Sequence, residues 1–121
     1  MKKRILIIED EVTLIQLLTL VLSKENYEVH ICQNGRDAIA KIKKIRPHVI
    51  LLDVMLPGMD GRSIVSIMEQ DLELAGIPVI VMSALAASEK MLKAFPQVKA
   101  FCIKPFVLKD LISKVKQIVG D

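Results

Sequence analysis

Three acidic residues of this sequence directly follow or end short apolar segments, in positions where their carboxylates can act together. Glu9 and Asp10 come after the Ile-rich run Arg4–Ile8, and Asp53 follows the run Val49–Leu52. Carboxylates that converge repel one another, and a hard divalent cation with oxygen ligands relieves this repulsion. Since His and Cys ligands are missing from this group, the pattern favours Mg²⁺ over Zn²⁺.

A hydroxyl and an ammonium group hold equivalent positions after two later apolar segments. Ser83 follows Val79–Met82, and Lys104 follows Ala100–Ile103. A lysine beside carboxylates that hold a metal suits an anionic ligand, most naturally phosphate. Each residue alone has an ordinary explanation, because serine often caps a helix, Lys-Pro is often a loop, and acids favour helix N-termini. Their occurrence at four strand ends of one chain is the pattern that indicates a site.

Five short apolar segments alternate with segments of helical periodicity. The apolar segments are typical of strands in a parallel sheet, and they are Arg4–Ile8, Glu28–Cys32, Val49–Leu52, Val79–Met82 and Ala100–Ile103. The spacing of apolar residues between them predicts helices over about 13–24 and 38–45, a third that carries Ile64, Ile67 and Met68, and two more over about 85–94 and 108–119. Asp60 is the expected cap of the third helix. The sequence therefore predicts an α/β fold, a doubly wound five-stranded parallel sheet with five helices.

Length and composition exclude several classes of protein. The chain has 121 residues, of which 52% are hydrophobic and 26% are charged, so we expect one domain over 1–121 and no intrinsic disorder. The longest uncharged runs, Val12–Ser23 and Leu74–Ser88, are shorter than the roughly 20 apolar residues of a membrane span. No secretory leader follows the basic start, and we expect a cytoplasmic protein that does not bind membranes.

Neither the basic residues nor the cysteines suggest a further site. Aromatic residues make up 3% of the chain, too few for the stacking platforms of single-stranded nucleic-acid binders. The basic cluster is best explained as the solvated face of a helix, and it consists of Lys41, Lys43, Lys44 and Arg46. We therefore expect no direct nucleic-acid partner. Cys32 and Cys102 belong to no metal-binding pair and are expected to be buried, inert thiols.

The combined pattern resembles the receiver domain of response regulators in two-component and phosphorelay signalling. The matching stretches span essentially the whole chain, and they are Ile7–Glu11, Leu51–Gly61, Val81–Ala84 and Lys104–Phe106. The resemblance implies a flavodoxin-like receiver fold with the strand order 2-1-3-4-5. It also implies a phosphorylatable signalling switch whose partner is a sensor histidine kinase or a histidine phosphotransfer protein, with an unknown downstream effector. Such a domain is not an enzyme in the usual sense, because it catalyses only its own phosphorylation and dephosphorylation.

The resemblance also implies a role for individual residues around the acceptor. Asp53 matches the phosphoacceptor, and Asp10 matches the direct Mg²⁺ ligand. Glu9 is expected to assist the metal through water. Met55 is expected to give its backbone carbonyl to the metal, so its side chain need not be polar.

Further residues match the part of the family pattern that binds and senses the phosphoryl group. Ser83 and Lys104 are expected to bind phosphoryl oxygens, and the Lys104–Pro105 peptide bond is expected to be cis. Phe101 matches the position of the rotating aromatic switch. Phosphorylation is then expected to change the surface formed by the fourth helix, the fifth strand and the fifth helix.

The chain departs from the usual pattern in two places. The stretch Gln97–Ala100 stands where many relatives carry acids that form dimer salt bridges, so that dimer mode is not expected here. The sequence ends at Asp121, directly after the last predicted helix, and we expect no output domain within it. The resemblance then implies a stand-alone receiver or a receiver taken from a longer protein.

Two other functions fit parts of the pattern. A receiver-like interaction module without phosphorylation would not need the full set of acidic, hydroxyl and lysine residues, and their presence argues against it. A Mg²⁺-dependent phosphatase of the haloacid-dehalogenase kind needs Asp-x-Asp after the first strand. Here Asp53 follows the third strand, and Met55 stands two positions later.

The implied strand order also predicts that Cys32 and Cys102 form no disulfide. These residues lie in the second and fifth strands, the two edges of the sheet. Four strand spacings separate them by roughly 19 Å, whereas a disulfide needs Cα atoms within about 7 Å.

Overall fold

The computed structural model describes residues 2–84, 90 and 94–120. Its five strands pair in parallel in the order β2-β1-β3-β4-β5, which confirms the predicted class and strand order. The strands are β1 (Arg4–Ile8), β2 (Glu28–Cys32), β3 (Val49–Asp53), β4 (Val79–Ser83) and β5 (Val98–Ile103).

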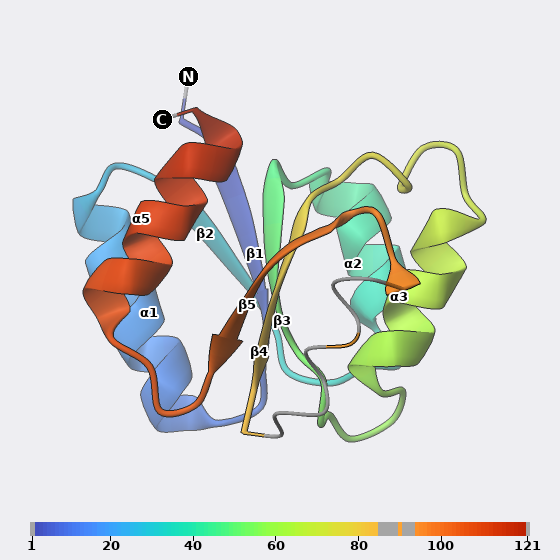
Figure 1. The fold of residues 1–121 in the computed structure, drawn as a ribbon, viewed down its shortest axis with the longest axis horizontal. Coiled ribbons are helices and arrows are strands. Elements are labelled where there is room, and N and C mark those ends of the chain that lie inside the picture. Colours follow the sequence, from blue (N-terminus) through green and yellow to red (C-terminus); the bar gives the residue numbers. More distant parts are fainter. Residues whose placement is uncertain (1, 85–89, 91–93, 121) are drawn as a thin grey trace.

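The described residues form four helices, which cover both faces of the sheet (Figure 1). On one face lie α1 (Val12–Lys24) and α5 (Leu108–Val119), and on the other lie α2 (Ala38–Ile45) and α3 (Gly61–Glu69). The helix predicted over 85–94 lies almost entirely outside the described residues, so the number of five helices stays a prediction. Among the described helices, none is both long enough and apolar enough to span a membrane.

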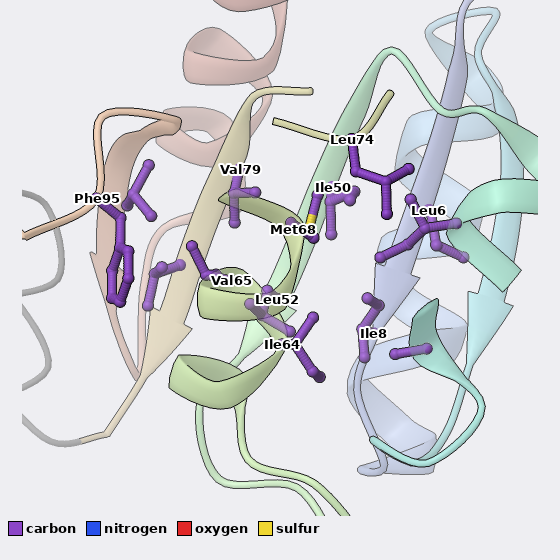
Figure 2. Packing of buried hydrophobic residues seen from close by; sticks show 14 of the residues in the cluster. Leu6, Ile8, Ile50, Leu52, Ile64, Val65, Met68, Leu74, Val79 and Phe95 are labelled. Atoms are coloured by element: carbon purple, nitrogen blue, oxygen red, sulfur yellow. The ribbon is translucent and has the colours of Figure 1, made fainter. Parts of the chain in front are cut away.

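The central strands are buried on both faces, which explains their uninterrupted apolar sequence. Leu6 and Leu52 pack toward α2 and α3, where Ile64 and Met68 of α3 meet them (Figure 2). The alternate residues of the same strands belong to a second cluster with α1 and α5, and they are Ile5, Ile7, Val49 and Leu51. Burial of each such side chain stabilises the fold by about 1.5–3 kcal/mol relative to its exposure. The two clusters together hold the carboxyl ends of β1 and β3 side by side.

The strands extend slightly further than the sequence predicts. Asp53 pairs with Met82 and is the last residue of β3, while Ser83 pairs with Ile103 and is the last residue of β4. The predicted start of β5 at Ala100 is wrong, because β5 begins at Val98. Val98 pairs with Val79 across an irregularity in the β4–β5 register, and apolar periodicity does not reveal such an irregularity.

Other local predictions hold in the structure. The Asp60 carboxylate caps α3 by accepting a hydrogen bond from the Ser63 backbone N–H at 2.8 Å. Cys32 on β2 and Cys102 on β5 are both buried and free, on opposite edges of the sheet. The absence of a disulfide between them is therefore confirmed.

Candidate functional site

The three acidic residues singled out by the sequence meet at the carboxyl edge of the sheet. One carboxylate oxygen from each of Glu9, Asp10 and Asp53 lies within 4.8 Å of the others. Glu9 is completely buried and Asp53 is 6% exposed, whereas Asp10 is exposed to solvent. They converge because β1 and β3 are neighbours in the sheet and end at the same level. This donor set consists of hard oxygen atoms, the kind that Mg²⁺ prefers.

Lys104 joins this cluster from the end of β5, which is an edge strand of the sheet. Its Nζ donates hydrogen bonds to Glu9 Oε1 at 2.7 Å and to Asp53 Oδ2 at 3.3 Å. The backbone N–H of Lys104 donates to the Ser83 carbonyl at 2.8 Å, so the β4–β5 ladder fixes where the side chain starts. The Lys104–Pro105 peptide bond is cis, as the resemblance implied.

The environment of Lys104 keeps its ammonium group charged. Partial burial alone lowers the pKa of Lys104, but the hydrogen bond and charge of Glu9, together with Asp53, outweigh it. The pKa of Lys104 is therefore raised above its ordinary value. A permanent positive charge beside Asp53 is suited to hold an anionic group there.

Glu9 uses both of its oxygens within the protein. While Oε1 accepts from Lys104, Oε2 accepts from the backbone N–H groups of Asp10 and Glu11, both at 3.1 Å. The Glu9–Lys104 pair was not predicted from the sequence. β1 and β5 are separated by two strands, and residue spacing does not show which side chains meet across them.

The loop after β3 contacts the carboxylate oxygen of Asp53 that does not face Lys104. Asp53 Oδ1 accepts a hydrogen bond from the Met55 backbone N–H at 3.1 Å. The Gly61 N–H donates to the Val54 carbonyl at 2.9 Å, which closes the loop at its base. Met55 itself is 58% exposed, so its side chain borders the site without being buried in it.

Solvent reaches the acids from the side of this loop. An open depression of about 720 Å³ adjoins Asp10. The residues that line it are Asp10, Val54, Met55, Leu56, Pro57, Asp60 and Arg62. A small phosphorylated molecule or a side chain of a partner protein can therefore approach the acidic cluster.

Ser83 and Phe101 lie on the adjacent strands β4 and β5. Ser83 is completely buried, and the residue before it, Met82, pairs with Asp53. Phe101 pairs with Val81 and packs, partly buried, against the cluster on the α2–α3 face. The structure thus places Ser83 on the strand next to β3 and Phe101 one strand further along the sheet.

One contact near the site, made by the turn after β2, was not predicted from the sequence. The Gly35 N–H donates to the Pro57 carbonyl in the β3–α3 loop at 2.9 Å. β2 and β3 both flank β1, so the loops that follow them emerge at the same edge. A glycine in each loop, Gly35 and Gly58, was the available signal.

Comparisons with known proteins agree with this geometry. The family model described as the response regulator receiver domain matches residues 5–116. The DNA-binding response regulator MtrA of Mycolicibacterium paratuberculosis is 29% identical over 117 residues, which are 96% of this chain and 51% of MtrA. The chain thus spans about half the length of the curated relatives it matches.

Solved structures give the same result. The receiver domain of a signal transduction histidine kinase from Syntrophus aciditrophicus is 29% identical, with a TM-score of 0.86 over 98% of this chain and 90% of that one. The phosphorylated cyanobacterial phytochrome response regulator RcpA is 29% identical, with a TM-score of 0.79 over 98% of this chain and 91% of that one. With the family model covering nearly the whole sequence, the chain belongs to the response regulator receiver domain family.

Proposed function

We propose that this domain accepts a phosphoryl group from a phosphohistidine onto Asp53 in a Mg²⁺-dependent reaction. The observation that carries the proposal is the convergence of two other carboxylates and one lysine on the nearly buried Asp53. Asp53 is the only one of these acids that ends a central strand of the sheet. The family of the chain and its phosphorylated relative RcpA support the same conclusion.

In the proposed reaction an Asp53 carboxylate oxygen attacks the phosphorus of the donor phosphohistidine. The new bond joins oxygen to phosphorus, the phosphorus–nitrogen bond breaks, and the imidazole leaves with a proton from solvent. Phosphoryl transfer depends mainly on alignment and on neutralisation of the phosphoryl oxygens. Lys104, 3.3 Å from Asp53 Oδ2, supplies a positive charge for one oxygen, and Ser83 is proposed to donate its hydroxyl to another.

The residues present fit a Mg²⁺ ion. Asp10 and Asp53 are proposed as direct ligands, with the Met55 backbone carbonyl as a third. Both Glu9 oxygens already accept hydrogen bonds, which supports a role for Glu9 through a water molecule. When bound, Mg²⁺ neutralises charge on the phosphoryl oxygens.

The proposed partners follow from the family. The donor is a histidine kinase or a histidine phosphotransfer protein, and one similar structure is itself the receiver domain of a signal transduction histidine kinase. The output is proposed to pass through the surface of the segment after β4, β5 and α5. We expect the domain to catalyse only its own phosphorylation and dephosphorylation, in the cytoplasm, without turnover of a separate substrate.

Mass spectrometry of the intact protein tests the proposal. Incubation with acetyl phosphate and Mg²⁺ is expected to add one phosphate, which hydroxylamine removes because it cleaves acyl phosphates. Addition of EDTA, or the substitution Asp53→Asn, should abolish the gain in mass. An unchanged mass in the wild-type protein would instead support the unphosphorylated interaction module.

A further inference from the structure

The turn after β2 and the loop after β3 approach each other more closely than side chains allow. Besides the hydrogen bond from Gly35 N–H to the Pro57 carbonyl, the Gly35 backbone lies directly against Met59. A Cβ atom added to Gly35 would lie 1.8 Å from the Met59 carbonyl oxygen and 2.6 Å from the Met59 nitrogen. Only glycine fits this position.

A second glycine, in the loop after β3, makes the corresponding contact with the turn after β2. Gly58 has a φ of 91°, a conformation that side-chain-bearing residues rarely adopt. A Cβ atom there would lie 2.8 Å from Arg36 Cγ and 3.1 Å from the Arg36 nitrogen. Each loop thus places a glycine against the neighbouring residue of the other, Gly35 against Met59 and Gly58 against Arg36.

From this contact we infer that Gly35 is a positioning residue for Mg²⁺ binding and phosphoryl acceptance at Asp53; the inference rests on the proposed function. Asp53 and Met55 lie at one end of the β3–α3 loop, whose base is closed by the Gly61–Val54 hydrogen bond. The later part of this loop, residues 57–59, contacts the β2–α2 turn. The turn therefore fixes where the Met55 carbonyl and N–H lie relative to Asp53.

The expected effect follows from the size of the clash. A methyl group at Gly35 needs ordinary van der Waals separation, so one of the two backbones must retreat by roughly 1.5 Å. A displacement of about 1 Å at a reacting centre can reduce the rate about 100-fold. Gly35→Ala is therefore expected to weaken Mg²⁺ binding and to slow phosphorylation, each by about 10-fold or more, without changing any of the three proposed ligands.

The test compares Gly35→Ala with two controls. Gly76→Ala makes the same chemical change where a Cβ atom meets nothing within 4 Å. Val115→Ala removes buried methyl groups from α5, on the other face of the sheet, and lowers the melting temperature for reasons unrelated to the loop. Mg²⁺ affinity is measured by amide NMR titration, together with the rate of labelling by acetyl phosphate.

Only Gly35→Ala should lose Mg²⁺ affinity, and its amide shifts should extend from residue 59 to residue 55. Affinity equal to that of Gly76→Ala, or a loss no larger than in Val115→Ala, would overturn the inference. Wild-type protein that binds no Mg²⁺ would overturn the proposed function, and the inference with it.

A second pair of variants decides the matter if Gly35→Ala does not fold. Gly58→Ala should weaken Mg²⁺ binding, because its methyl group meets the Arg36 side chain and because alanine is strained at a φ of 91°. Arg36→Ala alone should bind Mg²⁺ like wild type, and Arg36→Ala combined with Gly58→Ala should recover part of the lost affinity. No recovery in the double variant, or no loss in Gly58→Ala, would contradict the proposed coupling between the loops.

Discussion

Lys104 is the residue that connects the acidic cluster to the rest of the sheet. Its ammonium group satisfies Glu9, which has no exposed surface, and it also reaches Asp53. A buried carboxylate without a positive partner is costly, and loss of one member of a buried pair typically destabilises by 3–5 kcal/mol. The same side chain thus stabilises the fold and is available to a phosphoryl group.

The variant Lys104→Met tests this double role. It keeps the apolar part of the side chain and leaves Glu9 with only its two backbone N–H partners. We expect the free energy of unfolding to fall by about 3 kcal/mol in urea titrations. Glu9→Gln added to Lys104→Met should restore at least half of the loss, because the fully buried position 9 then carries no unpaired charge. A single variant as stable as wild type would show that the ion pair contributes nothing.

Asp10 is the exposed member of the acidic cluster, and its proposed role is that of a direct ligand. Asp10→Asn removes one charge but leaves the Asp53 nucleophile, so Mg²⁺ affinity should fall about 10-fold or more and labelling at Asp53 should slow. Glu11→Gln removes a charge from the next exposed residue, outside the cluster, and should bind Mg²⁺ within about twofold of wild type. Equal affinities of the two variants by titration would exclude Asp10 as a ligand.

At the scale of elements, the amino-terminal edge of the sheet holds a titratable contact. The backbone N–H of Arg4 donates to the ring nitrogen Nδ1 of His48 at 2.9 Å, and the backbone N–H of His48 donates to the Arg4 carbonyl at 2.8 Å. This pair joins the start of β1 to the segment that precedes β3. Burial, reinforced by the charges of Arg4 and Lys3, lowers the pKa of His48 below its ordinary value. A protonated Nδ1 can no longer accept the hydrogen bond.

The direction of the pH effect follows from that shift. The contribution of His48 to stability is fully present above about pH 6.5, the pKa of an unfolded histidine. It is lost as the pH falls through the lower pKa of the folded state. The variant His48→Asn can still accept the bond through its side-chain oxygen and does not titrate here. Urea unfolding at pH 7.5 and pH 5 should show a smaller loss of stability in the variant, and an equal loss in both proteins would contradict the assignment.

Most elements of this fold could be predicted from the sequence because their burial is simple. β1 and β3 lie between two helical layers, so nearly every residue in them is apolar, and the first polar residue marks the strand end. The start of β5 could not be predicted, because it depends on a register irregularity opposite Val79 and Ile80. Element order along the chain carries more information than element boundaries do.

The candidate site could be predicted in composition but not in all its contacts. Glu9, Asp10, Asp53, Ser83 and Lys104 follow or end strands that share one sheet edge, and parallel strand direction alone brings them near each other. The Glu9–Lys104 pair and the contact of Gly35 with Met59 depend on the reach of one side chain and on backbone separation. Neither quantity is encoded in residue spacing.

At the scale of the whole molecule, the proposed signal crosses the sheet from the acceptor strand to its far edge. Ser83 and Phe101 occupy neighbouring strands between Asp53 and α5. Phosphate on Asp53 adds negative charge and acceptor oxygens, which should draw the Ser83 hydroxyl toward it and allow Phe101 to turn inward. If Phe101 is only a core-packing residue, its side-chain orientation should not change on phosphorylation.

The variant Ser83→Ala separates acceptance of the phosphoryl group at Asp53 from transmission of the conformational change to β5 and α5. It retains the nucleophile and the proposed metal ligands, so it should still be labelled at Asp53. With beryllofluoride and Mg²⁺, amide NMR shifts in β5 and α5 should be large in wild type and strongly reduced in the variant. Shifts of wild-type size in the variant would contradict the coupling through Ser83.

The central claim is that Asp53, and no other carboxylate, takes the phosphoryl group. The most direct test is to label the protein with acetyl phosphate and Mg²⁺, reduce the acyl phosphate with borohydride, and map the product by peptide mass spectrometry. Reduction converts an aspartyl phosphate to homoserine, and we predict homoserine at position 53, only in samples that contained Mg²⁺. Homoserine at another aspartate, or an unmodified residue 53 in a protein that had gained phosphate, would contradict the claim.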